Sequence, residues 1–262
     1  MPVGHRDASW GPARMQVSGQ DAGHGARISR LRWVHATGRR AEIREPETAT
    51  NTPQPEVEVQ EIGLEEEMRV VLVGAGGFGR VALDVLLSGG FGERVLGFYD
   101  DAHAALSARV RGYPVLGDVE MLKSMLSIEP AHVVVAITDN AARLQVANAL
   151  RRLGGQFFTA VHPLAYVSDA ATVGGGCVLA AGAVVHPDAA VGSHCFVGPG
   201  AVVDRDAEVG AGVWVSAGCV VGPGAQVGAR AVLGPNSSVG RKAQVDAGVE
   251  VEGLRHVGRE GV

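Results

Sequence analysis

The stretch VGPGAV VDRDAE VGAGVW VSAGCV VGPGAQ, residues 197–226, decides the fold of this chain. Each group of six begins with an aliphatic residue, and this spacing runs without a slip through 17 consecutive hexads from Val161 to the end of the chain. The fifth place of a hexad is nearly always Ala or Cys, and the second place is often Gly. An internal repeat this regular is a stronger guide to fold than local propensity.

A period of six predicts short strands instead of helices, because a helix needs an apolar residue about every 3.6 positions. Residues two apart on a strand point to the same side, so the fifth place of one hexad and the first place of the next both face inward. The Gly-rich second place suits a turn. Three strands and three turns close a triangular coil, and stacked coils build a parallel β-helix of roughly six coils over residues 161–262.

Composition narrows the classes of protein that the chain can belong to. It has 262 residues, of which 46% are hydrophobic, enough for two modest domains. A net charge of −5 with no basic stripe argues against a nucleic-acid partner, and no apolar run reaches the ~18–20 residues of a membrane span. All three cysteines take the small fifth place of a hexad, so we interpret them as core residues of a cytoplasmic protein and predict no metal site.

Residues 1–67 show no sustained period and end in the acidic run Glu65 to Glu67. This composition predicts a disordered or weakly structured segment. All recognisable organisation begins at Met68, which motivates the hypothesis that translation starts there and that residues 1–67 are an upstream extension. N-terminal sequencing of the native protein would test this hypothesis, and a terminus near Met1 would contradict it.

Residues 68–160 alternate between strand and helix patterns. We expect strands at 69–73, 95–99, 131–137 and 156–160, and helices at 80–87, 117–127 and 140–153. Alternation of this kind predicts a small, mostly parallel sheet covered by helices, which is a Rossmann-like α/β domain.

A Gly-rich turn joins the first strand to the first helix. Gly74, Gly76 and Gly79 fit the G-x-G-x-x-G fingerprint, whose backbone N–H groups and helix N-terminus bind an anion such as a pyrophosphate. The pair Asp100 and Asp101 follows at the distance of a ribose-binding acid. Three interpretations stay open: a nucleotide-linked ligand, a nicotinamide dinucleotide, or a tight turn that binds nothing.

Five ordered motifs carry a family resemblance: GAGGFGRVALDVL, GFYDD, GYPVLGD, VVVAITDNAARL and VHPLAYVSDAATVGGG. From residue 68 to about 250, the chain resembles the bacterial sugar acyltransferases of the sialic-acid O-acetyltransferase type. The resemblance implies a Rossmann-like domain joined to a left-handed β-helix, a homotrimer, and acetyl transfer from acetyl-CoA. The acceptor would be the hydroxyl or amine of a nucleotide-linked or cell-surface-glycan sugar.

The resemblance also implies residue roles. The acceptor would contact Gly74, Gly76, Gly77, Phe78, Gly79, Asp100 and Asp101. Acetyl-CoA would lie in the groove between neighbouring subunits, along Trp214, Ser216, Gly218, Gly222, Gly234 and Asn236. Two positions depart from the family pattern, because Arg205 replaces the catalytic histidine before Asp206, and Trp214 replaces a second histidine near the thioester.

His186 is the candidate for a displaced base. It precedes Asp204 by 18 residues, which is one coil, so its side chain should stack beside the turn that holds Asp204 and Asp206. A carboxylate there would support the imidazolium of a general base; otherwise His186 is an exposed turn residue. The sequence thus favours an acetyltransferase of reduced activity, with a non-catalytic sugar-nucleotide-binding or assembly homologue and an NAD-dependent oxidoreductase as alternatives.

The sixth place of each hexad points outward and differs between the three faces of the prism. One face is largely polar, with Thr172, Ala190, Glu208, Gln226 and Gln244; the other two are largely apolar, one with Val178, Phe196, Trp214 and Val232 and one with Tyr166, Val184, Val202 and Val220. Two apolar faces exceed what a monomer normally exposes. We expect a homotrimer whose heterologous interface covers both, or docking of the small domain on part of one face.

Overall fold

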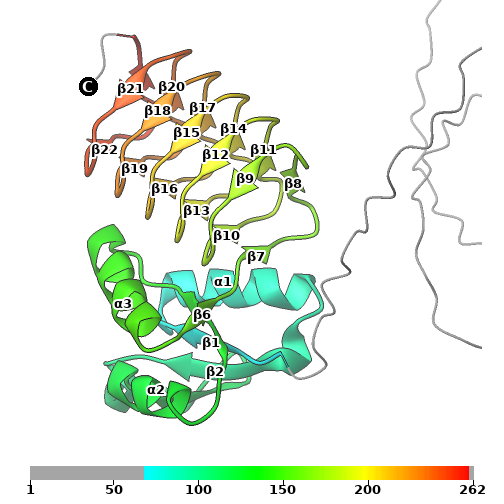
Figure 1. The fold of residues 1–262 in the computed structure, drawn as a ribbon, viewed down its shortest axis with the longest axis vertical. Helices are drawn as coiled ribbons and strands as arrows, with labels where there is room; N and C mark the ends of the chain where they lie inside the picture. The colour runs from blue at the N-terminus through cyan, green and yellow to red at the C-terminus, as the bar shows by residue number, and fades with distance from the viewer. Residues whose placement is uncertain (1–67, 260–262) are drawn as a thin grey trace, which may run out of the picture. The chain divides into compact units, whose positions relative to one another are not determined.

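The computed structural model describes residues 68–259, so the predictions for residues 1–67 lie outside the described residues. The described part contains the two expected folds, an α/β sandwich followed by a β-helix (Figure 1). No helix within residues 68–259 has the length and apolar character needed to cross a bilayer.

The α/β part is built on one six-stranded sheet with the order β3-β4-β2-β1-β5-β6. All neighbours pair in parallel except β3 and β4, which are antiparallel. The strands are β1 (Val70–Val73), β2 (Val95–Tyr99), β3 (Arg109–Val110), β4 (Tyr113–Gly117), β5 (His132–Val135) and β6 (Gln156–Phe157). The prediction of a small, mostly parallel Rossmann-like sheet is confirmed.

Helices cover both faces of this sheet. The elements are α1 (Gly77–Ser88), α2 (Val119–Leu126), α3 (Asn140–Arg152) and the 3-10 helices η1 (Gly92–Arg94) and η2 (His103–Ala105). Alternate residues of β1 serve the two faces: Val70 and Leu72 pack in the core with α1, and Val71 and Val73 pack in the core with α2 and α3. This division follows from the two-residue side-chain period of a strand.

The sequence analysis missed the hairpin of β3 and β4. Its turn is formed by Arg111 and Gly112, both with positive φ (48° and 88°), and β4 carries Pro114. A two-residue strand followed by a strand that contains proline leaves little periodic signal. The strand expected at 156–160 is also two strands, because β6 belongs to the small sheet and β7 (Ala160–Val161) begins the first coil of the β-helix.

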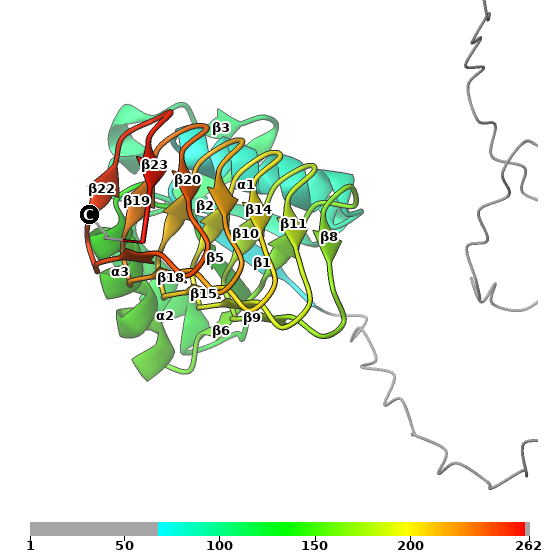
Figure 2. The ribbon, with the colours of Figure 1, turned by 90° about the horizontal axis from the view of Figure 1, so that it is seen from above.

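The repeat forms a triangular prism of two-residue strands, each made of the sixth place of one hexad and the first place of the next. The strands are β7, β8 (Tyr166–Val167), β9 (Thr172–Val173), β10 (Val178–Leu179), β11 (Val184–Val185), β12 (Ala190–Val191), β13 (Phe196–Val197), β14 (Val202–Val203), β15 (Glu208–Val209), β16 (Trp214–Val215), β17 (Val220–Val221), β18 (Gln226–Val227), β19 (Val232–Leu233), β20 (Ser238–Val239), β21 (Gln244–Val245), β22 (Glu250–Val251) and β23 (His256–Val257). Every third strand pairs in parallel, which gives three sheets (Figure 2).

The inside of the prism confirms the expected inward positions. Every first-place residue from Leu179 to Val257 is buried, and so are the fifth-place residues of the central coils, including the three free cysteines. Where the second place is glycine, as at Gly192, there is little room for a side chain: a Cβ there would lie 2.6 Å from the Ala211 nitrogen of the next coil.

One of the two apolar faces is covered by the α/β part of the same chain. Val178 and Phe196 are buried together with Phe78 and Ala82 of α1, and Trp214 packs against the same cluster. Figure 1 shows α1 between the small sheet and the coils, next to β7 and β10. The small domain of the same chain therefore covers this face, which is one of the two arrangements expected from the sequence. The other expectation, that a neighbouring subunit covers both apolar faces, is wrong for the face with Val178, Phe196 and Trp214.

His194 lies buried at the same junction. Its Nε2 is 3.1 Å from Nη2 of Arg151, and its ring packs edge-on against Phe157 at 4.6 Å. Burial, together with the nearby guanidinium groups of Arg151 and Arg143, lowers the pKa of His194 to about 4. The ring is therefore neutral, with no carboxylate hydrogen-bonded to it.

We expect His194 to make folding stability depend on pH. Since its folded pKa of about 4 lies below the ordinary 6.5, the unfolded chain binds the extra proton between these values, and stability falls as pH drops through this window. The loss should approach about 3 kcal/mol by pH 4. Chemical denaturation at pH 4.5 and 7.5 measures it. His194→Asn, which suits the positive φ of 58°, should flatten the dependence, and the exposed-site variant His256→Asn should not. Equal pH dependence in all three proteins would contradict this role.

Candidate functional site

A pocket of about 270 Å³ opens at the Gly-rich turn between β1 and α1. It is lined by Val73, Gly74, Gly76, Gly77, Phe78, Asp100, Asp101, Val119, Ala136, Ile137 and Thr138. Six of the seven residues expected to contact the acceptor therefore share one cavity, and Gly79 lies just beneath it, buried in α1. The cavity is smaller than the ~300–1,000 Å³ of typical ligand sites, so it can enclose only part of a large ligand.

The four glycines of the turn form two pairs that differ in the space around their Cα atoms. A Cβ at Gly79 would lie 1.9 Å from the Gly74 carbonyl oxygen, and a Cβ at Gly74 would lie 2.6 Å from the Ala136 oxygen. A Cβ at Gly76 or Gly77 would meet nothing within 4 Å. The first pair is required by close packing, whereas the second pair leaves open space at the mouth of the pocket.

The N-terminus of α1 faces this pocket without a cap. Gly76 at the N-cap supplies no side-chain hydrogen bond, and the first turn contains no acidic residue. The first backbone N–H groups of a helix lack intrahelical partners and carry partial positive charge. The arrangement suits an anion, and a phosphate group is the usual ligand of such a turn.

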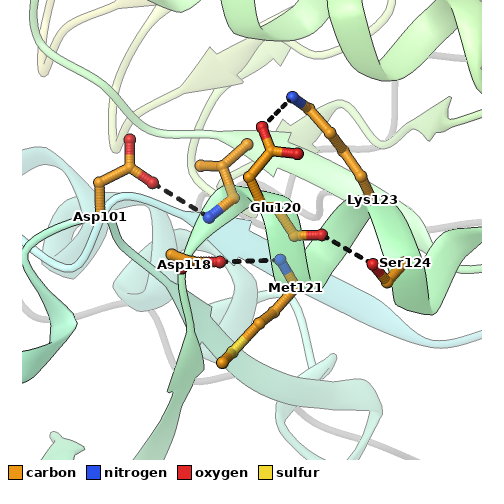
Figure 3. A network of polar contacts seen from close by, with 7 residues as sticks. Asp101, Asp118, Glu120, Met121, Lys123 and Ser124 are labelled. Atoms are coloured by element: carbon orange, nitrogen blue, oxygen red, sulfur yellow. Dashed lines mark hydrogen bonds and ion pairs between the residues drawn. The ribbon is translucent and has the colours of Figure 1, made fainter.

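The two predicted acidic residues are both engaged by backbone amides. Asp100 accepts hydrogen bonds from the Ala75 nitrogen (2.8 Å) and the Ala102 nitrogen (2.9 Å), so it holds the Gly-rich turn in place. Asp101 accepts from the Val119 nitrogen at the start of α2 (3.0 Å), and Figure 3 shows its carboxylate directed at that amide. A carboxylate can accept further hydrogen bonds, so both residues retain capacity for a ligand.

Phe78 belongs to the pocket and to the contact with the β-helix. Its ring centroid lies 4.8 Å from that of Trp214 and 5.0 Å from that of Phe196, both in edge-on geometry. Trp214, expected beside acetyl-CoA, therefore lies on the face that α1 covers. Its observed partners are aromatic rings and the Arg143 guanidinium, 5.7 Å from its ring centroid.

His186 and Asp204 form a hydrogen-bonded pair at one corner of the prism. Nδ1 of His186 is 2.9 Å from Oδ1 of Asp204, as the 18-residue spacing predicts. Burial raises the pKa of Asp204, but the hydrogen bonds from His186 and from the Arg205 amide (2.7 Å) outweigh this effect, so its pKa lies below the usual range. The ionised Asp204 fixes the ring and leaves Nε2 of His186 available to a reacting group.

Arg205 and Asp206 are separate from this pair. Both side chains are exposed, and Nε of Arg205 lies 3.9 Å from Oδ2 of Asp206. The structure therefore places Asp204, and not Asp206, next to the candidate base His186. Asp206 instead takes the positive-φ position of its turn, with φ 59°.

The residues expected along acetyl-CoA fall on two corners of the prism. Ser216, Gly218, Gly234 and Asn236 share one corner, where a Cβ at Gly218 would lie 2.2 Å from Oδ1 of Asn236. Gly222 follows β17 and belongs to the next corner, which also carries the His186 pair. The sheet between these two corners carries Tyr166, Val184, Val202 and Val220 on its outer side. Among residues 68–259, nothing covers these four side chains completely.

Two residues near the site, Asn140 and Arg143, were not singled out by the sequence patterns. Asn140 is buried, and its Nδ2 donates to the carbonyl oxygens of Arg230 (3.0 Å) and Ala231 (3.1 Å) in the β-helix. Arg143, one turn later on α3, is 1% exposed. Their only signal in the sequence was membership of the motif VVVAITDNAARL.

Both folded parts of the chain match known protein families. Residues 69–150 match the PglD N-terminal domain. Residues 159–205 and 206–241 match the bacterial transferase hexapeptide, a family of six repeats. No curated protein sequence matches the chain significantly.

Solved structures give matches along most of the chain. The chain is 31% identical to a perosamine N-acetyltransferase variant from Caulobacter crescentus in complex with CoA and GDP-perosamine, with a TM-score of 0.59, covering 72% of this chain and 90% of that one. It is 27% identical to the acetyltransferase domain of PglB from Neisseria gonorrhoeae in complex with acetyl coenzyme A, with a TM-score of 0.56, covering 73% of this chain and 93% of that one. In the first of these proteins a histidine is replaced by asparagine.

The two kinds of glycine in the turn should respond differently to alanine. Gly79→Ala forces a Cβ against a backbone oxygen at 1.9 Å, so α1 must shift, and we expect a loss of about 3 kcal/mol or more in unfolding free energy. Gly77→Ala meets no atom and should change stability by less than about 1 kcal/mol. Urea denaturation followed by circular dichroism measures both. The packing argument fails if the two variants are equally stable.

Proposed function

Because this chain belongs to the hexapeptide-repeat sugar acyltransferases, in which an α/β domain is joined to a left-handed β-helix, we propose that it transfers an acetyl group from acetyl-CoA to a nucleotide-linked sugar. The observation that carries this proposal is the similarity to the perosamine enzyme along nine-tenths of that protein, whose structure holds CoA and GDP-perosamine. The acetyl acceptor is the amine or a hydroxyl of the sugar.

The pocket at the Gly-rich turn supports the acceptor half of this function. An uncapped helix N-terminus next to Gly76 and Gly77 suits the diphosphate of a nucleotide-linked sugar. The engaged carboxylates of Asp100 and Asp101 can accept further hydrogen bonds from sugar or ribose hydroxyls. The volume of about 270 Å³ fits part of such a ligand and gives no support to a complete dinucleotide redox cofactor.

Acetyl transfer needs a base, and we assign this role to His186. The acceptor N–H or O–H must lose its proton as its heteroatom attacks the thioester carbon; the new C–N or C–O bond forms, the C–S bond breaks, and CoA leaves as the thiol. Arg205 cannot take the proton, because a guanidinium offers only N–H donors and no acceptor. His186 offers a free Nε2, and Asp204 supports the imidazolium that forms.

A non-catalytic binding homologue is the second candidate. Arg205 and Trp214 stand where the resemblance places histidines, and Trp214 packs under α1. These two residues favour a protein that keeps its ligands without acetyl transfer.

Variants of three residues separate the two candidates. Thiol release from acetyl-CoA, followed with a panel of nucleotide-linked amino sugars, should occur in the wild type, and His186→Ala should lower kcat by ~10²–10⁴. His256→Ala, at an exposed histidine that is bonded to Ser238 and not to a carboxylate, should leave the rate unchanged. An inactive wild type that gains activity through Arg205→His would instead identify the degenerate homologue.

The uncovered apolar face supports a homotrimer. The apolar stripe formed by Tyr166, Val184, Val202 and Val220 remains after the small domain has covered its own face, with Tyr166 56% and Val220 41% exposed. A heterologous interface around a three-fold axis would cover this stripe in every subunit. It would also place the residues expected to bind acetyl-CoA, which except for Trp214 flank the stripe, in a groove between two subunits.

The trimer predicts a mass of three chains of 27.0 kDa in solution. Light scattering on the full chain at micromolar concentration measures this mass. Val220→Glu, which places a charge on the stripe, should dissociate the assembly, and Gln226→Glu, on the polar face, should not. A wild-type monomer would contradict the trimer.

We place the protein in the cytoplasm. Cys177, Cys195 and Cys219 are free thiols inside the prism, a usage typical of a reducing compartment. Its partners would then be nucleotide-linked sugars and acetyl-CoA.

A further inference from the structure

We propose that Arg143 is a positioning residue for the acceptor pocket, through which the β-helix sets the shape of the pocket wall. This inference rests on the proposed function, because it concerns the pocket assigned to the nucleotide-linked sugar. Arg143 does not line the pocket itself. It acts through residues that do.

One end of the guanidinium holds the pocket wall. Nη1 of Arg143 donates to the carbonyl oxygens of Ile137 (2.7 Å) and Thr138 (3.1 Å), two successive residues that follow β5 and line the pocket. Two bonds from one nitrogen to neighbouring carbonyls fix the orientation of the peptide between them. The guanidinium carbon also lies 6.0 Å from the ring centroid of Phe78, which lines the pocket from α1. Lining residues from two separate elements therefore contact this one side chain.

The other end of the guanidinium holds the β-helix. Nε donates to the His194 carbonyl (2.9 Å), and Nη2 donates to the Gly212 carbonyl (2.9 Å) and to Oδ1 of Asn140 (2.6 Å). The carbonyls of His194 and Gly212 belong to successive coils at one corner of the prism. The bond to Asn140 adds a second route, since Asn140 binds the next coil.

All five N–H donors of Arg143 are thereby used, in a side chain that is 1% exposed. A lysine offers three donors on one atom and cannot reproduce a fork that spans two parts of the fold. Loss of the fork should leave the 137–138 peptide and Phe78 without their common support. Since misplacement of about 1 Å can cost about 10²-fold in a positioned site, the effect should appear in acceptor binding.

Arg151 supplies the matched control. It lies on the same helix, contacts His194 of the β-helix through Nη2 (3.1 Å) and packs over Phe157 at 5.2 Å, so it also joins the two parts of the chain. Its side-chain hydrogen bonds go to Asn148 and His194, neither of which lines the pocket. Arg151→Lys therefore tests for a general effect of weakening the junction.

The experiment measures dissociation constants of GDP, UDP and acetyl-CoA by calorimetry for the wild type, Arg143→Lys and Arg151→Lys. We expect Arg143→Lys to weaken nucleoside diphosphate binding by about tenfold or more, with acetyl-CoA binding as in the wild type, and Arg151→Lys to change neither. If Arg143→Lys does not fold, Trp214→Leu replaces it, because Trp214 contacts Arg143 and Phe78 from the β-helix without lining the pocket. Only the nucleoside diphosphate affinity is then compared, since Trp214 is itself among the residues expected along acetyl-CoA, and an unchanged affinity overturns the positioning role.

The outcomes separate the inference from the function on which it rests. The positioning role alone is overturned if Arg143→Lys binds nucleoside diphosphate as tightly as the wild type does. It is also overturned if Arg151→Lys weakens this binding as much as Arg143→Lys does. A folded variant in which acetyl-CoA affinity falls as much as nucleotide affinity does the same. A wild type that binds neither GDP nor UDP overturns the acceptor assignment of the pocket, and the positioning role with it.

Discussion

The buried guanidinium of Arg143 is the interaction on which the arrangement of this chain depends. Burying a cation away from water costs free energy unless hydrogen bonds satisfy its N–H donors. No carboxylate among residues 68–259 lies within ion-pair distance of Arg143. Burial accordingly lowers the pKa of Arg143. The compensation comes from five acceptors, four of which are backbone carbonyls that their own turns leave free. Because these carbonyls belong to the small sheet and to two coils, the charge can be satisfied only when both parts are folded and in contact.

The six-residue period then gives each face of the prism a separate use. The inward places vary little, since the buried coils carry Val or Leu at the first place and mostly Ala or Cys at the fifth, with Val213 and Ser237 as exceptions. The outward sixth place differs between faces and repeats on the same face every 18 residues, so each sheet presents mainly one kind of side chain until Ser238, Glu250 and His256 in the last coils. One face takes the aromatic rings that meet Phe78, one takes the Gln226–Gln244 hydrogen bond and its polar neighbours, and one keeps the apolar stripe.

Much of this could be predicted because it is periodic. The hexads predicted the coils, their inward residues and even the contact between His186 and Asp204, since one coil is always 18 residues. The features that the sequence did not predict are not periodic. The hairpin of β3 and β4 is too short to show a pattern, and Arg143 resembles any other arginine on a helix. Nothing local distinguishes a guanidinium that enters a junction from one in solvent, because the difference lies in carbonyls at positions 194 and 212, far along the chain. Trp214 was assigned from the resemblance alone, and its neighbours on α1 appear only in the folded chain.

The two departures from the family pattern are connected through this packing. Trp214 fills the space under α1 with an indole that packs edge-on against Phe78 and at a tilt against Phe196, so that position serves the junction and offers no basic nitrogen. Arg205 is exposed to solvent, and its guanidinium offers hydrogen-bond donors but no acceptor for a proton. Among the histidines of residues 68–259, His186 is the one bonded to a carboxylate, and it lies one coil before Arg205, displaced along the prism by about 4.8 Å. A base at His186 would therefore need the acceptor atom to lie one coil nearer the start of the prism than a base at position 205 would.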